Sequence, residues 1–477
     1  MKIAMIASEA NPLCKSGGLA DVVYSLSREL NANGEKAIVI LPYYNSIKKK
    51  DLHPEYLAYT YLNMSWRRQY VGVFKLVIDN IEYYLVDNEY YFARDGLYGY
   101  NDDIERFAYF SLAALDILKL INFQPDIIHV HDWQGGMIPC LLKERYRHDP
   151  FYSGIKTVLT IHNPAFKGLM DKYFLGNFYE LSDELYDRGL VRFENQVSTL
   201  KSAIVYADMI STVSPTHRNE LLTYELSHGL SPILALREQD FVGIVNGLDV
   251  VEFNPADDKR IVKNYSSKAF VMGKKANKED LLKSFALPVN DNPTYGLVSR
   301  LTWQKGIDLV LTNISYLVSQ GANVIILGNG EKKLEDAFQE MRDRYPNNVG
   351  IYIGYNDALA HKVYAGSDFF LMPSLFEPCG IGQIIAQRYG TLPLVRQTGG
   401  LVDTVISYDD TNAAIANGFS FRDYDGIALG YSINRSLGVY KDKNLLRKLI
   451  KNAMELDRSW KKSMNEYLAL YKRAVEK

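Results

Sequence analysis

The chain has 477 residues, of which 47% are hydrophobic and 23% are charged. This length exceeds one ordinary hydrophobic core, so two domains are expected, and the composition is typical of a globular protein. The net charge of −2 argues against a protein that binds nucleic acid or an acidic membrane surface. The apolar runs fall well short of the roughly 20 residues that a membrane span needs.

The start of the chain and the cysteines predict a cytoplasmic protein. MKIAMIASEA is a short apolar run that Glu9 interrupts, which is typical of a first strand and not of a signal peptide. Cys14, Cys140 and Cys379 are odd in number and have no paired spacing. This pattern argues against a disulfide framework and against a cysteine zinc site.

The first strand, over residues 2–7, leads through a loop to an amphipathic helix over residues 19–30. Gly17 and Gly18 stand at the start of this helix, and Lys15 lies just before them. Backbone amides, the helix dipole and an ammonium group together suit a phosphate. An ordinary turn between a strand and a helix explains the same residues equally well.

The segment that follows is rich in tyrosine. A strand is expected over residues 37–42, and residues 43–91 are predicted to add further strands or hairpins. The polar loop over residues 91–103, which contains Tyr98, is long enough to reach a cleft. A helix is expected over residues 105–120.

Two histidines mark the strand within residues 126–136. His129 and His131 alternate with apolar residues and therefore share a face, which suits either a metal or hydrogen bonds near the edge of a sheet. Hydrogen bonding is favoured because no third metal ligand is evident. Asp132 and Trp133 follow at the end of the strand, where they are placed to meet a ligand.

The strand over residues 156–163 ends in His162, which we interpret as a site residue because of that position. Residues 166–197 are expected to be irregular and helical. Further strands are expected over residues 207–214 and from residue 241, and the domain boundary is expected between residues 241 and 260.

The second half repeats the alternation of strand and helix, which predicts a second doubly wound parallel sheet. Arg300 and Lys305 flank the turn after its first strand. Two cations at a strand end suit a diphosphate, and a solvated basic loop is an equally good explanation. Tyr355 follows another strand and is placed to stack on a base.

Residues 369–405 concentrate the candidate chemistry. A buried strand is followed by a tight turn in which Pro378 biases Glu377 away from helical geometry. A helix follows and ends at Gly390, and after the next strand residues 398–400 open another helix. Loops that leave the same end of neighbouring strands bind ligands, and a helix N-terminus favours an anion. This pair of loops predicts a site for a sugar joined to a diphosphate.

The last helix, within residues 459–477, is amphipathic, with Trp460, Met464, Tyr467 and Tyr471 at helical spacing. Its apolar face must be buried on one of the two domains. A return to the first domain would give the chain a double linker.

Eight short motifs occur in the order found in one family: KSGGLAD, HVHDWQ, TIHNPAF, STVSPT, IVNGLD, SRLTWQKG, EPCGIGQ and RQTGGLVDTV. On these motifs the whole chain resembles the bacterial glycogen synthases, which are retaining glycosyltransferases. EPCGIGQ is a small variation on the family's more usual EPCGLGQ or EPCGLTQ.

The resemblance implies an α/β fold of two doubly wound Rossmann-like domains facing across a cleft, the glycosyltransferase B-type fold. An acceptor-side domain is then expected over residues 1–245, with residues 458–477 packing back on it. A donor-side domain is expected over residues 246–457.

The reaction that the resemblance implies is transfer of glucose from ADP-glucose to the non-reducing end of an α-1,4-glucan, with retention of configuration and with neither a metal nor an organic cofactor. Catalytic roles are implied for Glu377, Lys305, Arg300 and His162. Donor binding is implied for Lys15, Gly18, Asn246, Tyr355, Thr398, Gly399 and Gly400. Places in the sugar and acceptor cleft are implied for Asp21, Tyr98, Asp132 and Trp133.

Three alternatives stay open at this point. UDP-glucose could replace ADP-glucose, because no motif records the choice of base. A nucleotide-sugar epimerase on the same fold would need no glucan. An inactive glycan-binding protein is disfavoured because Lys15, His162, Arg300, Lys305 and Glu377 are all present.

Overall fold

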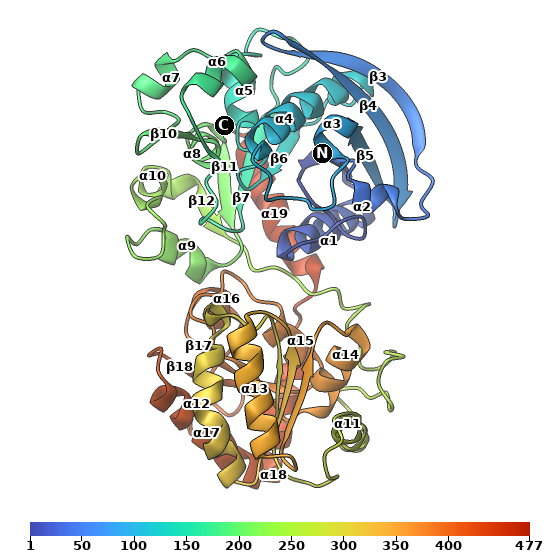
Figure 1. Ribbon diagram of the computed structural model, residues 1–477, viewed down its shortest axis with the longest axis vertical. Helices are drawn as coiled ribbons and strands as arrows, with labels where there is room; N and C mark the ends of the chain where they lie inside the picture. The colour runs from blue at the N-terminus through green and yellow to red at the C-terminus, as the bar shows by residue number, and fades with distance from the viewer. The chain divides into compact units, whose positions relative to one another are not determined.

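The computed structural model describes residues 1–477, which form two compact units (Figure 1). Unit 1 contains Met1–Asn246 and Trp460–Lys477, and unit 2 contains Gly247–Ser459. The last segment of the chain therefore belongs to unit 1. No helix has both the length and the apolar character that crossing a membrane requires.

Unit 1 is built on a nine-stranded sheet in which the first seven strands, in spatial order, run parallel and the last two form an antiparallel extension. The spatial order is β12 (Phe241–Gly243), β11 (Met209–Thr212), β7 (Lys156–Ile161), β6 (Ile127–His131), β1 (Lys2–Ile6), β2 (Lys36–Pro42), β5 (Ile81–Asp87), β4 (Arg67–Ile78) and β3 (Glu55–Met64). The strands and hairpin expected in the tyrosine-rich segment are thus present.

The centre of this sheet is buried on both faces, which explains the continuous apolar runs of its strands. Ile3, Ala4, Met5 and Ile6 of β1 are all fully buried. Burial of each large apolar side chain is worth about 1.5–3 kcal/mol relative to exposure. The helices of unit 1 are α1 (Gly18–Ala32), α2 (Asn45–Lys48), α3 (Glu89–Phe92), α4 (Asp103–Leu120), α5 (Ile138–Glu144), α6 (Tyr173–Tyr179), α7 (Glu184–Asp187), α8 (Thr199–Tyr206), α9 (Pro215–Leu221), α10 (Ser231–Ala235) and η1 (Glu238–Asp240).

The C-terminal helix α19 (Trp460–Val475) packs in unit 1 against α1, β7 and β11. Its apolar face is buried through Trp460, Met464, Tyr467 and Tyr471. The Tyr471 hydroxyl lies 2.8 Å from Nδ1 of His129 on β6, so a polar contact fixes this helix as well as apolar packing.

Unit 2 is a six-stranded parallel sheet with helices between successive strands. The spatial order is β15 (Val349–Ile353), β14 (Asn323–Gly328), β13 (Thr294–Val298), β16 (Phe369–Met372), β17 (Leu392–Arg396) and β18 (Phe419–Phe421). The helices are α11 (Val271–Ser284), η2 (Trp303–Lys305), α12 (Ile307–Ser319), α13 (Lys332–Arg344), α14 (Asp357–Gly366), α15 (Gly382–Arg388), α16 (Gly399–Thr404), α17 (Gly426–Lys441) and α18 (Lys443–Glu455).

Two features were not expected from the sequence. Residues 166–197 were expected to lack strands, yet β8 (Leu169–Met170), β10 (Gln196–Ser198) and β9 (Arg192–Phe193) pair in a small antiparallel sheet. Strand β18 adds a sixth strand to the sheet of unit 2. These strands have only two or three residues each, so they are too short to produce a hydrophobic period.

Candidate active site

In unit 2, a largely buried ion pair of Lys305 and Glu377 joins the loops that follow β13 and β16. Glu377 lies between β16 and α15 and is 8% exposed. Its Oε2 accepts a hydrogen bond of 2.6 Å from Nζ of Lys305 and one of 3.1 Å from Oγ of Ser374. The sequence separates the two charged residues by 72 positions, and the parallel sheet brings them together at the carboxyl ends of its neighbouring strands.

Two glycines allow the loops around this ion pair to approach closely. Gly306 follows Lys305 with φ of +69°, and a Cβ there would lie 2.0 Å from the carbonyl oxygen of Pro373. Gly399 opens α16 with φ of +44°, and a Cβ there would lie 2.0 Å from the carbonyl oxygen of Glu377. Any other residue at either position would push the backbone of the Glu377 loop away.

The turn of residues 398–400 therefore supports the Glu377 loop, which the sequence did not reveal. The amide of Gly400 donates to the carbonyl oxygens of Glu377 and Pro378 at 3.2 and 3.1 Å. We predicted bare amides at this helix start as a cradle for phosphate, and the Gly400 amide is already engaged with the protein. Thr398 precedes α16 in extended conformation and is 2% exposed.

The remaining predicted residues of unit 2 are accessible to solvent. Arg300 is exposed in the loop between β13 and η2. Tyr355 is 81% exposed between β15 and α14, and its hydroxyl lies 3.5 Å from the Asp357 carboxylate. Both follow strands of the same parallel sheet, so they extend the polar edge on which Lys305 and Glu377 lie.

In unit 1, the loop after β1 gathers charged groups around the start of α1. Nζ of Lys15 donates to both carboxylate oxygens of Asp21, at 2.8 and 2.7 Å. Asn11 donates to the same carboxylate. Lys15 is half exposed, so Asp21 positions its ammonium group while leaving it accessible.

The glycine pair at the start of α1 has no steric explanation within the protein. A Cβ on Gly17 or Gly18 would meet no atom within 4 Å, and neither residue has a positive φ. This contrasts with Gly399, where the backbone demands glycine. The fold therefore does not require either glycine on steric grounds, and the Gly17 amide bonds the Glu9 carboxylate.

A carboxylate that sequence analysis missed as a site residue lies beside this turn. Glu9, directly after β1, is 4% exposed and accepts hydrogen bonds from the amide and the hydroxyl of Ser16. Burial raises its pKa. Its position just beyond a parallel strand, like that of Glu377, was the available signal.

Two buried histidines, His129 and His131, and the partly buried His162 just after β7 form a polar layer that reaches α19. Nδ1 of His131 lies 3.0 Å from Nε2 of His162. His129 uses both ring nitrogens, at 2.8 Å from the Tyr471 hydroxyl and 2.6 Å from the Thr160 hydroxyl. We predicted that His129 and His131 make hydrogen bonds and do not bind a metal. The contacts of His129 agree, because both of its ring nitrogens are engaged.

Burial strongly disfavours protonation of these imidazoles. It lowers the pKa of His129 and of His162 to about 3, and it holds the pKa of His131 well below its ordinary value. The imidazole of His162 is therefore neutral at physiological pH. A neutral imidazole suits hydrogen bonding to a hydroxyl better than charge stabilisation.

Asp132 holds the backbone that carries His162. It adopts a left-handed conformation with φ of +52°, and its Oδ1 accepts from the amides of His162 and Asn163 at 2.7 and 3.2 Å. Burial raises the pKa of Asp132 to about 7. The contacts of this residue make it a support for His162.

Trp133 and Tyr98 lie in one aromatic cluster, because the ring centroid of Phe107 is 5.2 Å from that of Trp133 and 5.9 Å from that of Tyr98. The Tyr98 hydroxyl lies 2.7 Å from Oγ of Ser8, directly after β1. Both predicted cleft residues thus have ordered side chains. Asn246, the last residue of this part of unit 1, has a buried Oδ1 with no hydrogen-bond partner.

The three cysteines are buried, and the pKa of Cys14 argues against a reactive thiol there. Cys14, Cys140 and Cys379 are free and buried, as expected for a chain without a disulfide framework. Burial raises the pKa of Cys14 and of Cys140 to about 12. Desolvation outweighs the charge of Lys50, which acts to lower the pKa of Cys14.

Both halves of the chain match known protein families. Residues 2–236 match the family described as starch synthase catalytic domain, and residues 278–456 match glycosyl transferases group 1. A glycogen synthase of Clostridium kluyveri is 44% identical over 474 residues, which cover 99% of each chain.

Structural comparison gives the same result. The catalytic domain of starch synthase IV from Arabidopsis thaliana, bound to ADP and acarbose, has a TM-score of 0.90 at 31% identity, covering 100% of this chain and 99% of that one. A sucrose-phosphate synthase from Thermosynechococcus elongatus has a TM-score of 0.62 at 16% identity over 99% of each chain, which shows the fold alone. The predicted B-type fold of two Rossmann-like domains is confirmed.

The two kinds of glycine predict opposite effects on stability. Gly399→Ala should lower the free energy of unfolding by at least about 2 kcal/mol, because the left-handed conformation and the contact with the Glu377 carbonyl both oppose a Cβ. Gly18→Ala should leave stability unchanged or raise it by up to about 1 kcal/mol, since alanine favours a helix. Differential scanning calorimetry of both variants measures this. Equal melting temperatures would contradict the role of Gly399.

The buried histidines predict loss of stability in mild acid. Below the ordinary histidine pKa of about 6.5, the unfolded chain takes up protons that folded His129, His131 and His162 do not. The contribution of the three neutral imidazoles to the free energy of unfolding is therefore complete above that pH and is lost as the pH falls. We expect a loss of about 1.4 kcal/mol per pH unit for each histidine.

Urea unfolding followed by fluorescence from about pH 7.5 to about pH 5.5 tests this slope. His131→Asn should reduce the slope of the free energy of unfolding against pH by the amount that corresponds to one proton. His53→Gln removes an exposed imidazole and should leave it unchanged. Stability that does not change over this range would show that the three imidazoles do not keep depressed pKa values in the folded protein.

Proposed function

The chain belongs to the glycogen synthase family of glycosyltransferases, and we propose that it transfers glucose from ADP-glucose to the non-reducing end of an α-1,4-glucan with retention of configuration. The observation that carries this proposal is the largely buried ion pair of Lys305 and Glu377 at the sheet edge of unit 2. We further propose that the protein works in the cytoplasm, in glycogen biosynthesis.

The choice of donor and acceptor rests on relatives. The starch synthase IV structure, 31% identical over the full length, is bound to ADP, which favours ADP-glucose over UDP-glucose. The relatives that are 43–45% identical over nearly their full length are named glycogen synthase, which favours a polymeric glucan acceptor over the epimerase alternative.

Unit 2 is assigned to the donor. Arg300 and Lys305 bind the diphosphate, and Tyr355 stacks on the adenine. Arg300 and Tyr355 are exposed and follow strands of one parallel sheet, as ligand-binding residues of such sheets do. Thr398, Gly399 and Gly400 also belong to the donor side, and the Gly400 amide, which donates to the carbonyl oxygens of Glu377 and Pro378, ties this turn to the Glu377 loop.

Unit 1 is assigned to the acceptor and to the sugar. Lys15 and the amide of Gly18 contact the donor, which is supported by a glycine that the fold does not require. Asp21 holds Lys15 in place, and neutral His162 bonds a glucose hydroxyl. Asn246, with its buried and unsatisfied Oδ1, contributes to the donor side, and the cleft residues are Tyr98, Asp132 and Trp133.

The mechanism follows from charge that appears only during the reaction. Cleavage of the bond between glucose and phosphate leaves positive charge on the sugar and negative charge on the departing diphosphate. Glu377 stabilises the first and Lys305 the second. Because both groups are held in a nearly dry site, they stabilise developing charge without reorganising solvent.

In the structure, each of these charged groups neutralises the other across 2.6 Å. The ammonium of Lys305 must turn toward the diphosphate when the donor binds, and Ser374 keeps its 3.1 Å contact with Glu377. The pair thus holds a carboxylate and a cation in place before substrate arrives, at little electrostatic cost.

Incorporation of labelled glucose tests the proposed reaction. With ADP-[14C]glucose, label should enter glycogen, and the product should be α-1,4-linked by its susceptibility to amylase. UDP-[14C]glucose should react much more slowly. Conversion of the nucleotide sugar in the absence of glycogen, with no label in polymer, would support the epimerase instead.

Substitution of the ion pair tests the roles of its members. Glu377→Gln should lower single-turnover elongation by about 10²–10³-fold, roughly 3–4 kcal/mol, with ADP-glucose affinity changed only a few-fold, because neutral hydroxyls face it before reaction. Lys305→Met should lower turnover by a similar factor and also weaken binding, because the ground-state diphosphate is already anionic.

Calorimetric titration with ADP-glucose gives the affinities, and circular dichroism confirms that the variants fold. Lys15→Met serves as a comparison, because its ammonium is half exposed and paired with Asp21, and it should lower turnover less than Lys305→Met does. A Glu377→Gln enzyme that bound donor weakly but turned over normally at saturation would show that Glu377 only anchors the substrate.

A further inference from the structure

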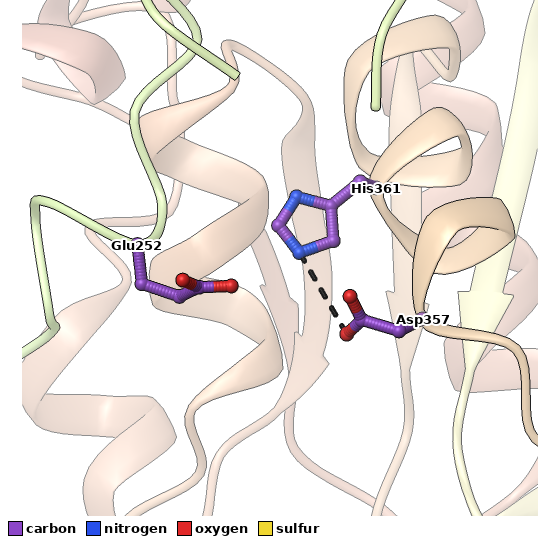
Figure 2. A group of neighbouring side chains, drawn as sticks. All are labelled: Glu252, Asp357 and His361. Carbon is purple, nitrogen blue, oxygen red and sulfur yellow. Dashed lines mark ion pairs between the residues drawn. The ribbon is translucent and has the colours of Figure 1, made fainter. Parts of the chain in front are cut away.

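Three side chains outside the proposed donor site converge in unit 2. Glu252 lies in the loop that precedes α11, and Asp357 and His361 lie one turn apart on α14. One ligand atom from each residue lies within 4.8 Å of the others. Figure 2 shows the three side chains directed toward one another, with the imidazole facing both carboxylates.

His361 is fixed in orientation. It is 1% exposed, and its ring stacks on Phe253 with the ring centroids 5.1 Å apart. Its Nδ1 lies 2.6 Å from Oδ2 of Asp258, a carboxylate that also pairs with Arg260 and therefore accepts the Nδ1 proton. A histidine that donates one N–H to a carboxylate and presents its other nitrogen is the arrangement found around protein-bound metals.

The second ring nitrogen has no hydrogen-bond partner. Nε2 of His361 is buried, and Oδ1 of Asp357 lies 3.9 Å from it. In the neutral ring this nitrogen carries a lone pair that faces a carboxylate oxygen, which is unfavourable unless a cation lies between them.

Arg260 organises the carboxylates but does not fill this position. Its Nη1 donates to Oε1 of Glu252 at 2.6 Å and to Oδ2 of Asp357 at 3.0 Å. The guanidinium therefore holds the two carboxylates side by side through one oxygen of each. With Asp258 included, the three carboxylates and one guanidinium leave an excess of two negative charges.

We propose that Glu252, Asp357 and His361 form a binding site for a divalent transition-metal cation of the zinc class. One imidazole nitrogen and two carboxylate oxygens suit Zn²⁺ better than Mg²⁺ or Ca²⁺, which prefer oxygen ligands alone. The charge of the cation balances the local excess. Three protein ligands leave a fourth position for water.

The geometry requires only a small adjustment. Bond lengths near 2.1 Å in a tetrahedral zinc site place its ligand atoms about 3.4 Å apart. The His361–Asp357 separation is 3.9 Å and the widest in the set is at most 4.8 Å. Glu252 and Asp357 have half-exposed side chains, 51% and 52%, so they are free to close on the buried imidazole and give the ion a path of entry.

The site joins the start of unit 2 to α14. Glu252 belongs to the segment just after the boundary of unit 1, and Asp357 opens the helix that follows Tyr355. A bound cation would hold this segment on α14 and stabilise unit 2, independently of the proposed glucosyl transfer.

Titration of the ligand-free, chelator-treated full chain with zinc chloride in a calorimeter tests the proposal. The wild-type protein should bind one equivalent and show a higher melting temperature, which excess EDTA should reverse. Glu252→Gln and Asp357→Asn should each weaken binding at least tenfold. Both positions are half exposed, so these variants should fold.

Two control variants separate this site from adventitious binding. Asp336→Asn removes a carboxylate of similar exposure on α13, and His53→Gln removes an exposed histidine that lies 2.6 Å from Asp51. Both should bind zinc as the wild type does. Absence of binding up to millimolar zinc, or binding lost in His53→Gln but kept in Glu252→Gln, would overturn the proposal.

Discussion

The candidate site in unit 2 depends on close contact between three loops at one sheet edge. The ion pair of Lys305 and Glu377 exists because Gly306 and Gly399 let the backbones after β13 and β17 touch the loop after β16. A Cβ at either glycine would separate these loops and, with them, the two charges. The positions of the two charges are therefore a consequence of backbone packing. Because little water reaches them, they interact strongly with charge that develops nearby.

Unit 1 positions its polar groups by a different device. The imidazole of His162 is held by His131 on one side, and its backbone is held by the carboxylate of Asp132. His129 extends this buried layer to Tyr471 on the C-terminal helix. The last helix of the chain is thus a polar as well as an apolar support for the strands that carry the site. Burial keeps the imidazoles neutral, which suits recognition of hydroxyl groups.

Much of the architecture follows from local pattern. Runs such as residues 323–328 are apolar throughout because parallel strands are covered on both faces, and helices lie between them. The same pattern located Glu377 and His162, since polar residues directly after such strands lie at the ligand-binding edge. It did not distinguish a glycine that the backbone requires from one at which the fold leaves room for a side chain. That difference at Gly399 and Gly18 depends on which atoms lie nearby.

The sequence by itself determined the two doubly wound sheets, the family and the residues at strand ends, because hydrophobic period and motif order are properties of the chain. Only the tertiary structure decided which of these residues meet. It paired Lys305 with Glu377 and engaged the Gly400 amide. It also brought Glu252 to His361, 109 positions away in the sequence. Such contacts depend on strand order and loop packing, and neither is encoded in the residues on either side of a motif.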